Sequence, residues 1–385
     1  DMHNVAVGYE AGHDITTGIQ NTLVGGNVGD ALTSGQFNVA MGYGALGSAT
    51  DTDQSVAIGH GALATLNYSG DSNNTAVGHN AGGSATTAIQ STFIGSFAGD
   101  AVTTGLANTA IGYNALSGED GHGYNTAVGH GALKVQDAGA NAYNVAVGAS
   151  AGLSVTTGIY NTLVGGLSGD ALTIGNSNVA VGYAALTSEI QGDRNVAVGV
   201  AALQSQSNSS DVDAFNTAVG YYAGQQVTTG TNNVIVGGLA GDALTTGSYN
   251  TALGLGALGS EDAHGRNVAI GYLALTTQDA GADAYNVAIG FSAGQSITTG
   301  IVNTIIGGLA GDALTTGQAN VAIGGEALSN ETDSHSSVAI GYQALATQDA
   351  SSGTNTYNVA VGRSAGLSVT TGIRNTLVGG LTGDA

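Results

Sequence analysis

Apolar and polar residues alternate in one short phrase that returns along the whole chain. The phrase Asn-Val-Ala-Val-Gly begins at Asn4, and comparable phrases begin at Asn21, Asn38 and Ser55 and continue to Asn375. There are 22 copies, usually 17 residues apart, with steps of 19 or 21 residues at every fourth copy. Alternation with a period of two predicts β-strands, and nothing in the phrase has helical spacing. We call each copy a coil and number it from its Asn or Ser, which is position 1.

The longer steps define a second period of four coils, which we call types 1 to 4. The coils at Asn144 and Asn161 illustrate types 1 and 2, while types 3 and 4 carry an Ala-Leu pair, as at Ala185-Leu186. Type 4 also holds a variable loop, such as residues 204–215. We predict one continuous array over residues 1–385, with super-repeats that start at residues 4, 74, 144, 216, 286 and 358.

The coil length limits the fold. Seventeen extended residues span at most about 56 Å, enough for one narrow closed turn of two short strands. Stacked turns form parallel ladders with strands about 4.8 Å apart, and each turn contacts only its neighbours. The sequence therefore predicts an all-β protein, a parallel β-solenoid. Its strands should start near position 1 and cover the following four residues.

Side-chain volumes vary systematically between coil types. Position 3 is Ala in 16 coils and large only in type 2, at Leu23, Phe93, Leu163, Ile235, Ile305 and Leu377. In the same coils position 6 shrinks to Gly26, Ser96, Gly166, Gly238, Gly308 and Gly380, whereas elsewhere it is often Tyr or His. A close-packed interior needs equal volume in every layer. We therefore expect positions 3 and 6 to share one apolar layer.

Two positions are nearly invariant. Position 5 is Gly in every coil, which predicts a positive φ or a backbone too close for a Cβ atom. Position 1 is Asn 19 times and Ser three times. Asn tolerates the left-handed region, and stacked amides can hydrogen-bond along the coils. We expect an Asn ladder.

Composition excludes several classes of function. Only 8% of residues are charged, against about 25% in ordinary domains, but 42% are hydrophobic, so a thin core can form. The net charge of −22 disfavours nucleic acid as a partner. No apolar run approaches the roughly 18 residues of a membrane helix, so we expect no membrane insertion in this segment. There is no Cys, and the compartment stays open on that ground.

These residues carry a resemblance to known fibres. The in-register Asn-Thr/Val-Ala-Val/Ile-Gly phrase resembles the head repeats of trimeric autotransporter adhesins, and the longer form over residues 125–133 resembles phage tail-fibre repeats. The resemblance implies a left-handed β-roll, three parallel chains side by side and a role in surface attachment. The coils are longer than those typical of adhesin heads, and the sequence shows no stalk heptads or membrane anchor. Phage and cellular origins both stay open.

Candidate ligand sites were weighed against simpler explanations. Gly-Asp phrases ending at Asp170 and Asp312 are similar to a calcium repeat, but they recur only once in four coils, which favours turn chemistry. His60 and His79 share position 6 on successive coils and could stack about 4.8 Å apart. Because Tyr, Phe, Leu and Arg occupy the same column elsewhere, we interpret it as packing rather than as a metal site.

Thr pairs suggest one further ligand. Thr156-Thr157, Thr245-Thr246 and Thr315-Thr316 could form an ice-binding array, but the pairs occur in only two coil types of four, and Thr is also a good strand residue. No Ser, His and Asp recur together in a catalytic arrangement. We therefore assign no catalytic, cofactor-binding or metal-ligating residue and expect no enzyme activity.

The sequence thus predicts a segment of a longer extracellular fibre that attaches to a host cell or surface. Its expected partners are two further copies, in a parallel homotrimer, and a receptor. The acidic loops 118–124 and 204–215 are the expected variable contacts. The alternative is a solenoid that binds ice or calcium.

Overall fold

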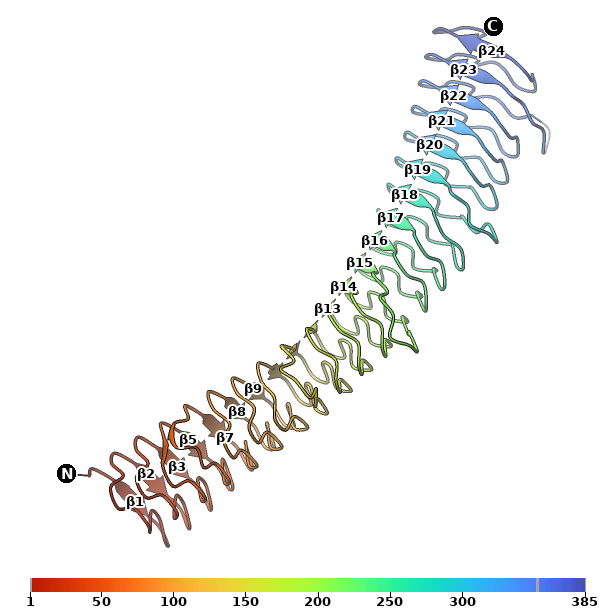
Figure 1. Cartoon of the computed structure of the whole chain (residues 1–385). Coiled ribbons are helices and arrows are strands. Elements are labelled where there is room, and N and C mark those ends of the chain that lie inside the picture. The colour runs from red at the N-terminus through yellow and green to blue at the C-terminus, as the bar shows by residue number, and fades with distance from the viewer. Residues whose placement is uncertain (1, 351–352, 385) are drawn as a thin grey trace. The chain divides into compact units, whose positions relative to one another are not determined.

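The computed structural model describes residues 2–350 and 353–384 and shows a parallel β-solenoid of 22 coils (Figure 1). Within the described ranges there is no helix. The chain forms two compact units. Unit 1 comprises residues 1–193 and 209–212, and unit 2 comprises residues 194–208 and 213–385.

Unit 1 contains one main ladder of three-residue strands. Each strand pairs in parallel with the strand of the next coil. The strands are β1 (Val5–Val7), β2 (Thr22–Val24), β3 (Val39–Met41), β5 (Val56–Ile58), β7 (Thr75–Val77), β8 (Thr92–Ile94), β9 (Thr109–Ile111), β10 (Thr126–Val128), β11 (Val145–Val147), β12 (Thr162–Val164) and β13 (Val179–Val181).

Unit 2 repeats the same arrangement, again with parallel pairs between successive coils. The strands are β14 (Val196–Val198), β15 (Thr217–Val219), β16 (Val234–Val236), β17 (Thr251–Leu253), β18 (Val268–Ile270), β19 (Val287–Ile289), β20 (Thr304–Ile306), β21 (Val321–Ile323), β22 (Val338–Ile340), β23 (Val359–Val361) and β24 (Thr376–Val378).

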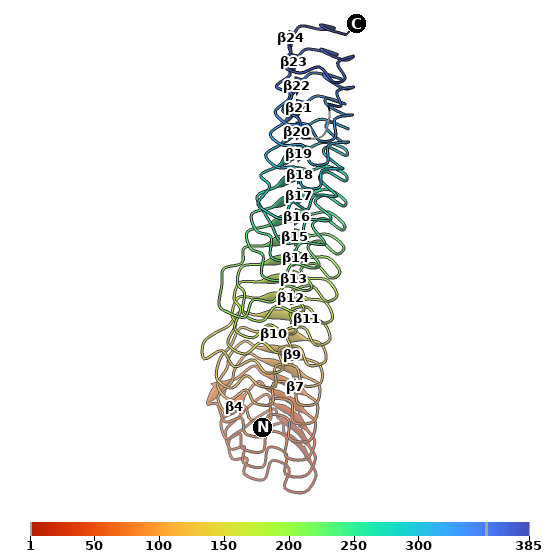
Figure 2. The same ribbon diagram turned by 90° about the vertical axis from the view of Figure 1, so that its right-hand side faces the viewer.

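The register of the ladder is the register of the repeat. Leu163 pairs with Ala180, so position 3 lies beside position 3 in the neighbouring coil. In Figure 2 the strands of successive coils follow one another along each unit. The strands occupy positions 2 to 4, which confirms the predicted location, although they begin one residue later and are shorter than expected.

The expectation of two strands in each coil was wrong. The far side of the coil is built from turns, and the described residues add only one short pair there, β4 (Thr52–Asp53) with β6 (Gly70–Asp71). The reason lies in the backbone. Many residues at positions 7 and 9 have a left-handed φ, for example Ala184 at 54° and Leu186 at 54°. A chain that alternates into the left-handed region cannot continue as an extended strand.

The interior consists of four columns, at positions 1, 3, 9 and 12. Away from the terminal coils, position 3 is fully buried, while positions 2 and 4 of the same strands point outward. The largest buried side chain is Phe93, at position 3 of a type 2 coil. Alternation of inward and outward residues along a three-residue strand is the pleat itself.

Positions 3 and 6 do not share an apolar layer, so that prediction was wrong. Position 6 is outside the coil, where Tyr9 is 73% and Tyr183 is 59% exposed. A Cβ atom on Gly166 would lie 3.6 Å from the ring of Tyr183, not against Leu163. The small residue at position 6 therefore makes room for an outer ring of the next coil.

The volume compensation takes place between positions 3 and 9. Position 9 is Gly in types 1 and 2, and Cβ atoms built on Gly152 and Gly169 would each lie 2.8 Å from a methyl group of Leu163. In types 3 and 4 position 3 is Ala, and position 9 is a fully buried leucine in every case. These leucines are Leu46, Leu63, Leu116, Leu133, Leu186, Leu203, Leu258, Leu275, Leu328 and Leu345.

Both nearly invariant positions have the structural roles that the sequence predicted. The position 5 glycines have φ between 123° and 144°, and before the last coil a Cβ atom there would lie 2.1–2.7 Å from the backbone of the next coil. At position 1, Asn161 Oδ1 accepts a hydrogen bond from Asn178 N at 2.9 Å, and Asn161 Nδ2 donates to Gly175 O at 2.9 Å. The Asn column thus joins neighbouring coils and closes each coil on itself.

Candidate functional site

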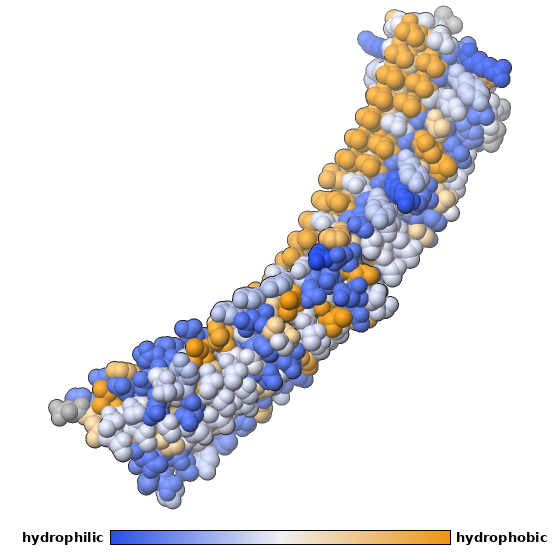
Figure 3. All heavy atoms as spheres, in the orientation of Figure 1, coloured by the Kyte–Doolittle hydropathy of each residue, from blue (hydrophilic) through white to orange (hydrophobic). Residues whose placement is uncertain are grey.

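The outer face of the strands is an uncharged surface on a strongly acidic chain. Position 2 is Val or Thr and position 4 is aliphatic in all 22 coils. Both point outward, and several are substantially exposed, such as Val219, Val234 and Leu253 at 36%, 43% and 44%. We call this surface the strand face. In Figure 3 hydrophobic residues form a continuous band along one edge of unit 2.

Aromatic residues at position 6 border the strand face on one side. In unit 1 the ring centroids of Tyr43 and His60 are 5.6 Å apart, and those of His60 and His79 are 5.2 Å apart. The stacking of the two histidines is therefore confirmed. The same type of contact joins Tyr113 to His130 at 5.5 Å, which supports a packing column whose members vary.

A second aromatic column, at position 17, borders the other side of the strand face. In unit 1 Tyr124, Tyr143 and Tyr160 stack with centroid separations of 4.9 and 5.8 Å. In unit 2 the guanidinium of Arg266 lies between the rings of Tyr249 and Tyr285, at 5.7 and 5.5 Å. Cations over aromatic faces attract the ring quadrupole. The strand face is thus edged by stacked rings in both units.

The Gly-Asp phrases are part of turns. Thr187 Oγ1 donates a hydrogen bond to Asp170 Oδ1 from the next coil. Asp312 Oδ1 is buried without a hydrogen-bond partner among the described residues, and burial raises the pKa of this carboxyl. The two phrases lie in different units, so they do not combine into one site.

The first Thr of each predicted ice-binding pair is engaged within the protein. Thr156, Thr245 and Thr315 donate their hydroxyl protons to backbone carbonyls of the next coil, at 3.2, 2.8 and 3.1 Å. These hydroxyl groups therefore join neighbouring coils rather than standing free on the surface.

Position 12 carries polar residues that the sequence analysis did not single out. In type 3 coils four buried glutamates occupy it, namely Glu119, Glu189, Glu261 and Glu331. In the type 4 coils that follow, buried glutamines occupy it, namely Gln136, Gln206, Gln278 and Gln348. Buried carboxylates need hydrogen-bond or charge partners, so these positions identify the most demanding polar environment in the interior.

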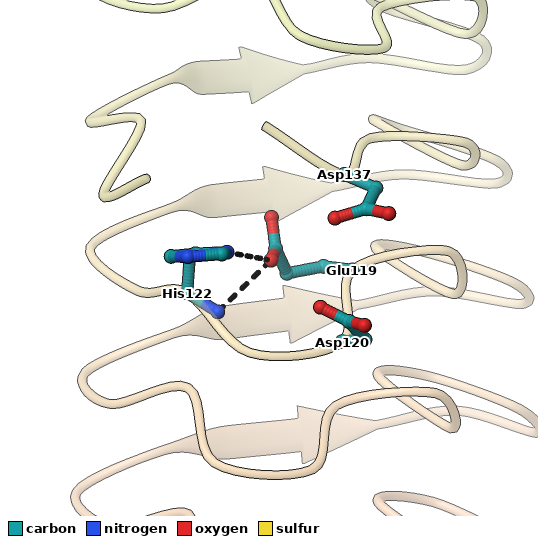
Figure 4. Close-up of side chains that lie close together, drawn as sticks. All are labelled: Glu119, Asp120, His122 and Asp137. Carbon is teal, nitrogen blue, oxygen red and sulfur yellow. Dashed lines mark hydrogen bonds and ion pairs between the residues drawn. The ribbon is translucent and has the colours of Figure 1, made fainter. Parts of the chain in front are cut away.

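The loop 118–124 brings Glu119 together with three further side chains (Figure 4). Ligand-type atoms of Glu119, Asp120, His122 and Asp137 all lie within 4.8 Å of one another. Glu119 Oε1 accepts a hydrogen bond from His122 N at 3.0 Å and lies 3.4 Å from His122 Nδ1. Figure 4 shows the Glu119 carboxylate between the imidazole on one side and the two aspartates on the other. We call this group cluster 1.

An equivalent group, cluster 2, occurs in unit 2. It consists of Glu261, Asp262, His264 and Asp279, again within 4.8 Å. The sequence signal is the phrase Glu-Asp-x-His followed by an Asp 17 residues after the first Asp, as in Asp120 and Asp137. It was missed because the search looked for columns that recur in every coil, whereas this signal occurs only in the second and fourth super-repeats.

Burial dominates the electrostatics of both clusters. Burial raises the pKa of Glu119, and it raises the pKa of Glu261 to about 7, with Asp279 and Asp262 adding to the effect. Hydrogen bonds from the backbone of His122 and His264 act in the opposite direction. A carboxyl that is removed from water and placed beside other carboxylates is harder to ionise.

The loop 204–215 contributes differently. Gln206 is buried and its Oε1 accepts a hydrogen bond from Asn216 Nδ2 at 3.1 Å, whereas Asp211 is exposed. This loop therefore presents surface residues on a buried anchor, as expected for a variable contact segment.

Two comparisons with known proteins complete the description. Within the described residues there is no helix that could cross a membrane. No protein-family model matches the chain, and no curated protein matches it.

Proposed function

We propose that this chain is a segment of an extracellular structural and adhesive fibre, the role that its repeat resembles in adhesin heads and phage tail fibres. The observation that supports this role is the strand face, which is uncharged in every coil although the chain carries a net charge of −22. Extended apolar surfaces on soluble proteins mark interaction sites.

The occupant we propose for the strand face is a second copy of the same chain. Because every coil presents Val or Thr at position 2 and an aliphatic residue at position 4, the face repeats at the strand spacing along each unit. A parallel sister chain offers the same spacing, so its side chains can interdigitate coil by coil. Negative charge outside the face stays in solvent, where repulsion between copies is screened. Closed association through one such face favours a parallel homotrimer.

Attachment to a host cell or surface is assigned to the acidic loops 118–124 and 204–215. Such loops project from a rigid scaffold and can vary without disturbing the ladder. The engaged hydroxyls of the Thr pairs give the ice-binding alternative no comparable support.

Multi-angle light scattering of the full chain at micromolar concentration tests the assembly. The expected mass is three times that of the monomer. Val164→Lys in β12 combined with Ile289→Lys in β19 should shift the chain toward monomer, because both residues lie at position 4 of the strand face. Asp211→Lys, which changes charge in the exposed loop, is the matched control and should leave the mass unchanged. A monodisperse monomer of the unmodified chain would contradict the proposal.

Adhesion is tested with beads coated with the chain and applied to intact cells. Replacement of residues 204–215 by a short glycine-serine turn should lower bead retention, while the Lys substitutions on the strand face should act only through assembly. Equal retention with and without the loop would remove it as the contact.

A further inference from the structure

The buried glutamates at position 12 differ in whether the protein satisfies them. In the fifth super-repeat Gln348 Nε2 donates a hydrogen bond to Glu331 Oε2 at 2.9 Å, and Ser334 N donates to Glu331 Oε1 at 2.9 Å. In clusters 1 and 2, Oε2 of Glu119 and Oε2 of Glu261 are buried and have no hydrogen-bond partner among the described residues. An unpaired buried acceptor is costly, so its repetition in both units requires an explanation.

The imidazoles show the same deficit. Nδ1 of His122 and Nδ1 of His264 are buried without a hydrogen-bond partner, although each ring lies beside the glutamate, with Nδ1 to Oε1 distances of 3.4 and 3.7 Å. Two independent clusters thus present the same pair of unsatisfied atoms, a carboxylate oxygen and an imidazole nitrogen. Both kinds of atom are ligands for metal ions.

The aspartates strengthen this pattern. Asp120 and Asp137 hold position 13 in successive coils, so two like charges are stacked beside a buried carboxyl. At the same pair of positions in the fifth super-repeat, Thr332 Oγ1 donates to Asp349 Oδ1 at 3.1 Å. In the first, Thr50 Oγ1 donates to Asn67 Oδ1 at 2.8 Å. Where Asp replaces Thr, the hydroxyl donor is lost and a further negative charge takes its place.

We propose that clusters 1 and 2 each bind one divalent transition-metal ion through Glu119, Asp120, His122 and Asp137, or through their counterparts Glu261, Asp262, His264 and Asp279. Donor atoms on opposite sides of one ion are separated by about twice the metal–ligand distance, on the order of 4–5 Å, so a group within 4.8 Å fits. Carboxylates alone would suit calcium or magnesium, whereas an imidazole favours ions such as Zn²⁺ or Mn²⁺.

Such an ion would link two coils. Glu119, Asp120 and His122 belong to a type 3 coil, and Asp137 belongs to the type 4 coil that follows it, so the ligands span the extended step between super-repeats. Binding neutralises the stacked aspartates and supplies the partner that the buried glutamate lacks. This inference does not depend on the fibre role, because it concerns the interior and one loop rather than the strand face.

Isothermal titration of the chelator-treated full chain with Zn²⁺ tests the proposal. We expect two saturable sites for each chain, and a rise in the thermal midpoint as they fill. Asp137→Asn should remove one site and Asp137→Asn with Asp279→Asn should remove both, with affinity lowered at least tenfold for each altered site. Both aspartates are exposed, so these variants should fold normally.

Asp349→Asn is the matched control. It alters position 13 of the fifth super-repeat, where the cluster has Thr332 and Ser334 in place of an Asp and a His, and it should leave two sites. X-ray absorption of the Zn²⁺-loaded chain should show one imidazole nitrogen for each ion, lost in the His122→Gln and His264→Gln double variant. No saturable binding, stoichiometry unchanged in the double Asp variant, or tighter binding of Ca²⁺ than of Zn²⁺ would each overturn the proposal.

Discussion

Leu163 occupies the space that Gly169 leaves open in the same coil. A Cβ atom on Gly169 would lie 2.8 Å from Leu163 Cδ2, and φ at Gly169 is 53°. In coils of types 3 and 4 the relation is reversed, because an alanine at position 3 faces a leucine at position 9 whose φ lies between 47° and 57°. The two coil families are therefore two solutions to one packing problem.

The first prediction concerns this exchange. Leu163→Ala should leave a cavity and destabilise the surrounding coils by about 2–5 kcal/mol. Adding Gly169→Leu should recover much of the loss, since the double variant reproduces the arrangement of types 3 and 4 and ten natural leucines already adopt the required φ. Hydrogen exchange around β12 measures both effects, because solenoid stability depends on neighbouring coils.

Gly166→Ala is the control for that experiment. Its new methyl group would face the ring of Tyr183 rather than the cavity, so it should not rescue Leu163→Ala. Rescue by Gly166→Ala, or a double Leu163→Ala and Gly169→Leu variant less stable than Leu163→Ala alone, would contradict the assignment of position 9 as the partner.

The second prediction concerns position 5. Gly165 has φ of 136°, and a Cβ atom there would lie 2.4 Å from Gly182 O. Gly165→Ala should therefore cost on the order of 3 kcal/mol or more, because both the backbone conformation and the contact with a fixed carbonyl are unfavourable. Gly139→Ala is the comparison, since φ of 66° is also positive there but nothing lies within 4 Å. Similar thermal midpoints for the two variants would refute the close-approach explanation.

Most of the fold could be predicted from the sequence because each coil is its own register mark. The phrase around Asn161 places the strand, the glycine at position 5 and the Asn ladder without any long-range information. The partner of Leu163 could not be identified in the same way. Positions 6 and 9 are both Gly in most type 2 coils, and only the left-handed turn after the strand decides which of them faces inward.

The clusters illustrate a different limit. Glu119 and His122 are three residues apart and could be noticed together, but the burial of Glu119 depends on position 12 being an interior column. That column follows from the turns at positions 7 and 9, which the sequence analysis interpreted as a second strand. Once the turns are known, the spacing of 17 residues between Asp120 and Asp137 places both at the same height of successive coils.

The third prediction concerns the Asn ladder. Asn161→Ala removes the acceptor of the Asn178 N–H and the donor to Gly175 O, both buried, and should cost about 1–3 kcal/mol for each group left unpaired. Asn161→Ser should cost less, because Ser91 Oγ accepts the corresponding hydrogen bond from Asn108 N at 3.2 Å. Chemical denaturation of the three proteins gives the order, and equal stability of the Ala and Ser variants would show that the ladder acceptor contributes little.

The fourth prediction follows from the pKa of Glu261, which burial raises from its ordinary 4.5 to about 7 in the metal-free protein. The folded state therefore holds this proton more tightly than the unfolded state. Its contribution to stability is complete below pH 4.5 and is lost as the pH rises to about 7. In the presence of chelator, the thermal midpoint of the unmodified chain should fall over this range relative to that of Glu261→Gln.

Using the difference between the two proteins removes the contribution of the other acidic groups, including the neighbouring Asp262 and Asp279, because both proteins carry them. Added Zn²⁺ should reverse the trend for the unmodified chain, since binding requires the deprotonated carboxylate and so strengthens as the pH rises. A difference in thermal midpoint that stays constant between pH 4.5 and 7 in chelator would show that Glu261 ionises normally in the folded chain, and that its carboxylate is better solvated than its burial in the interior column implies.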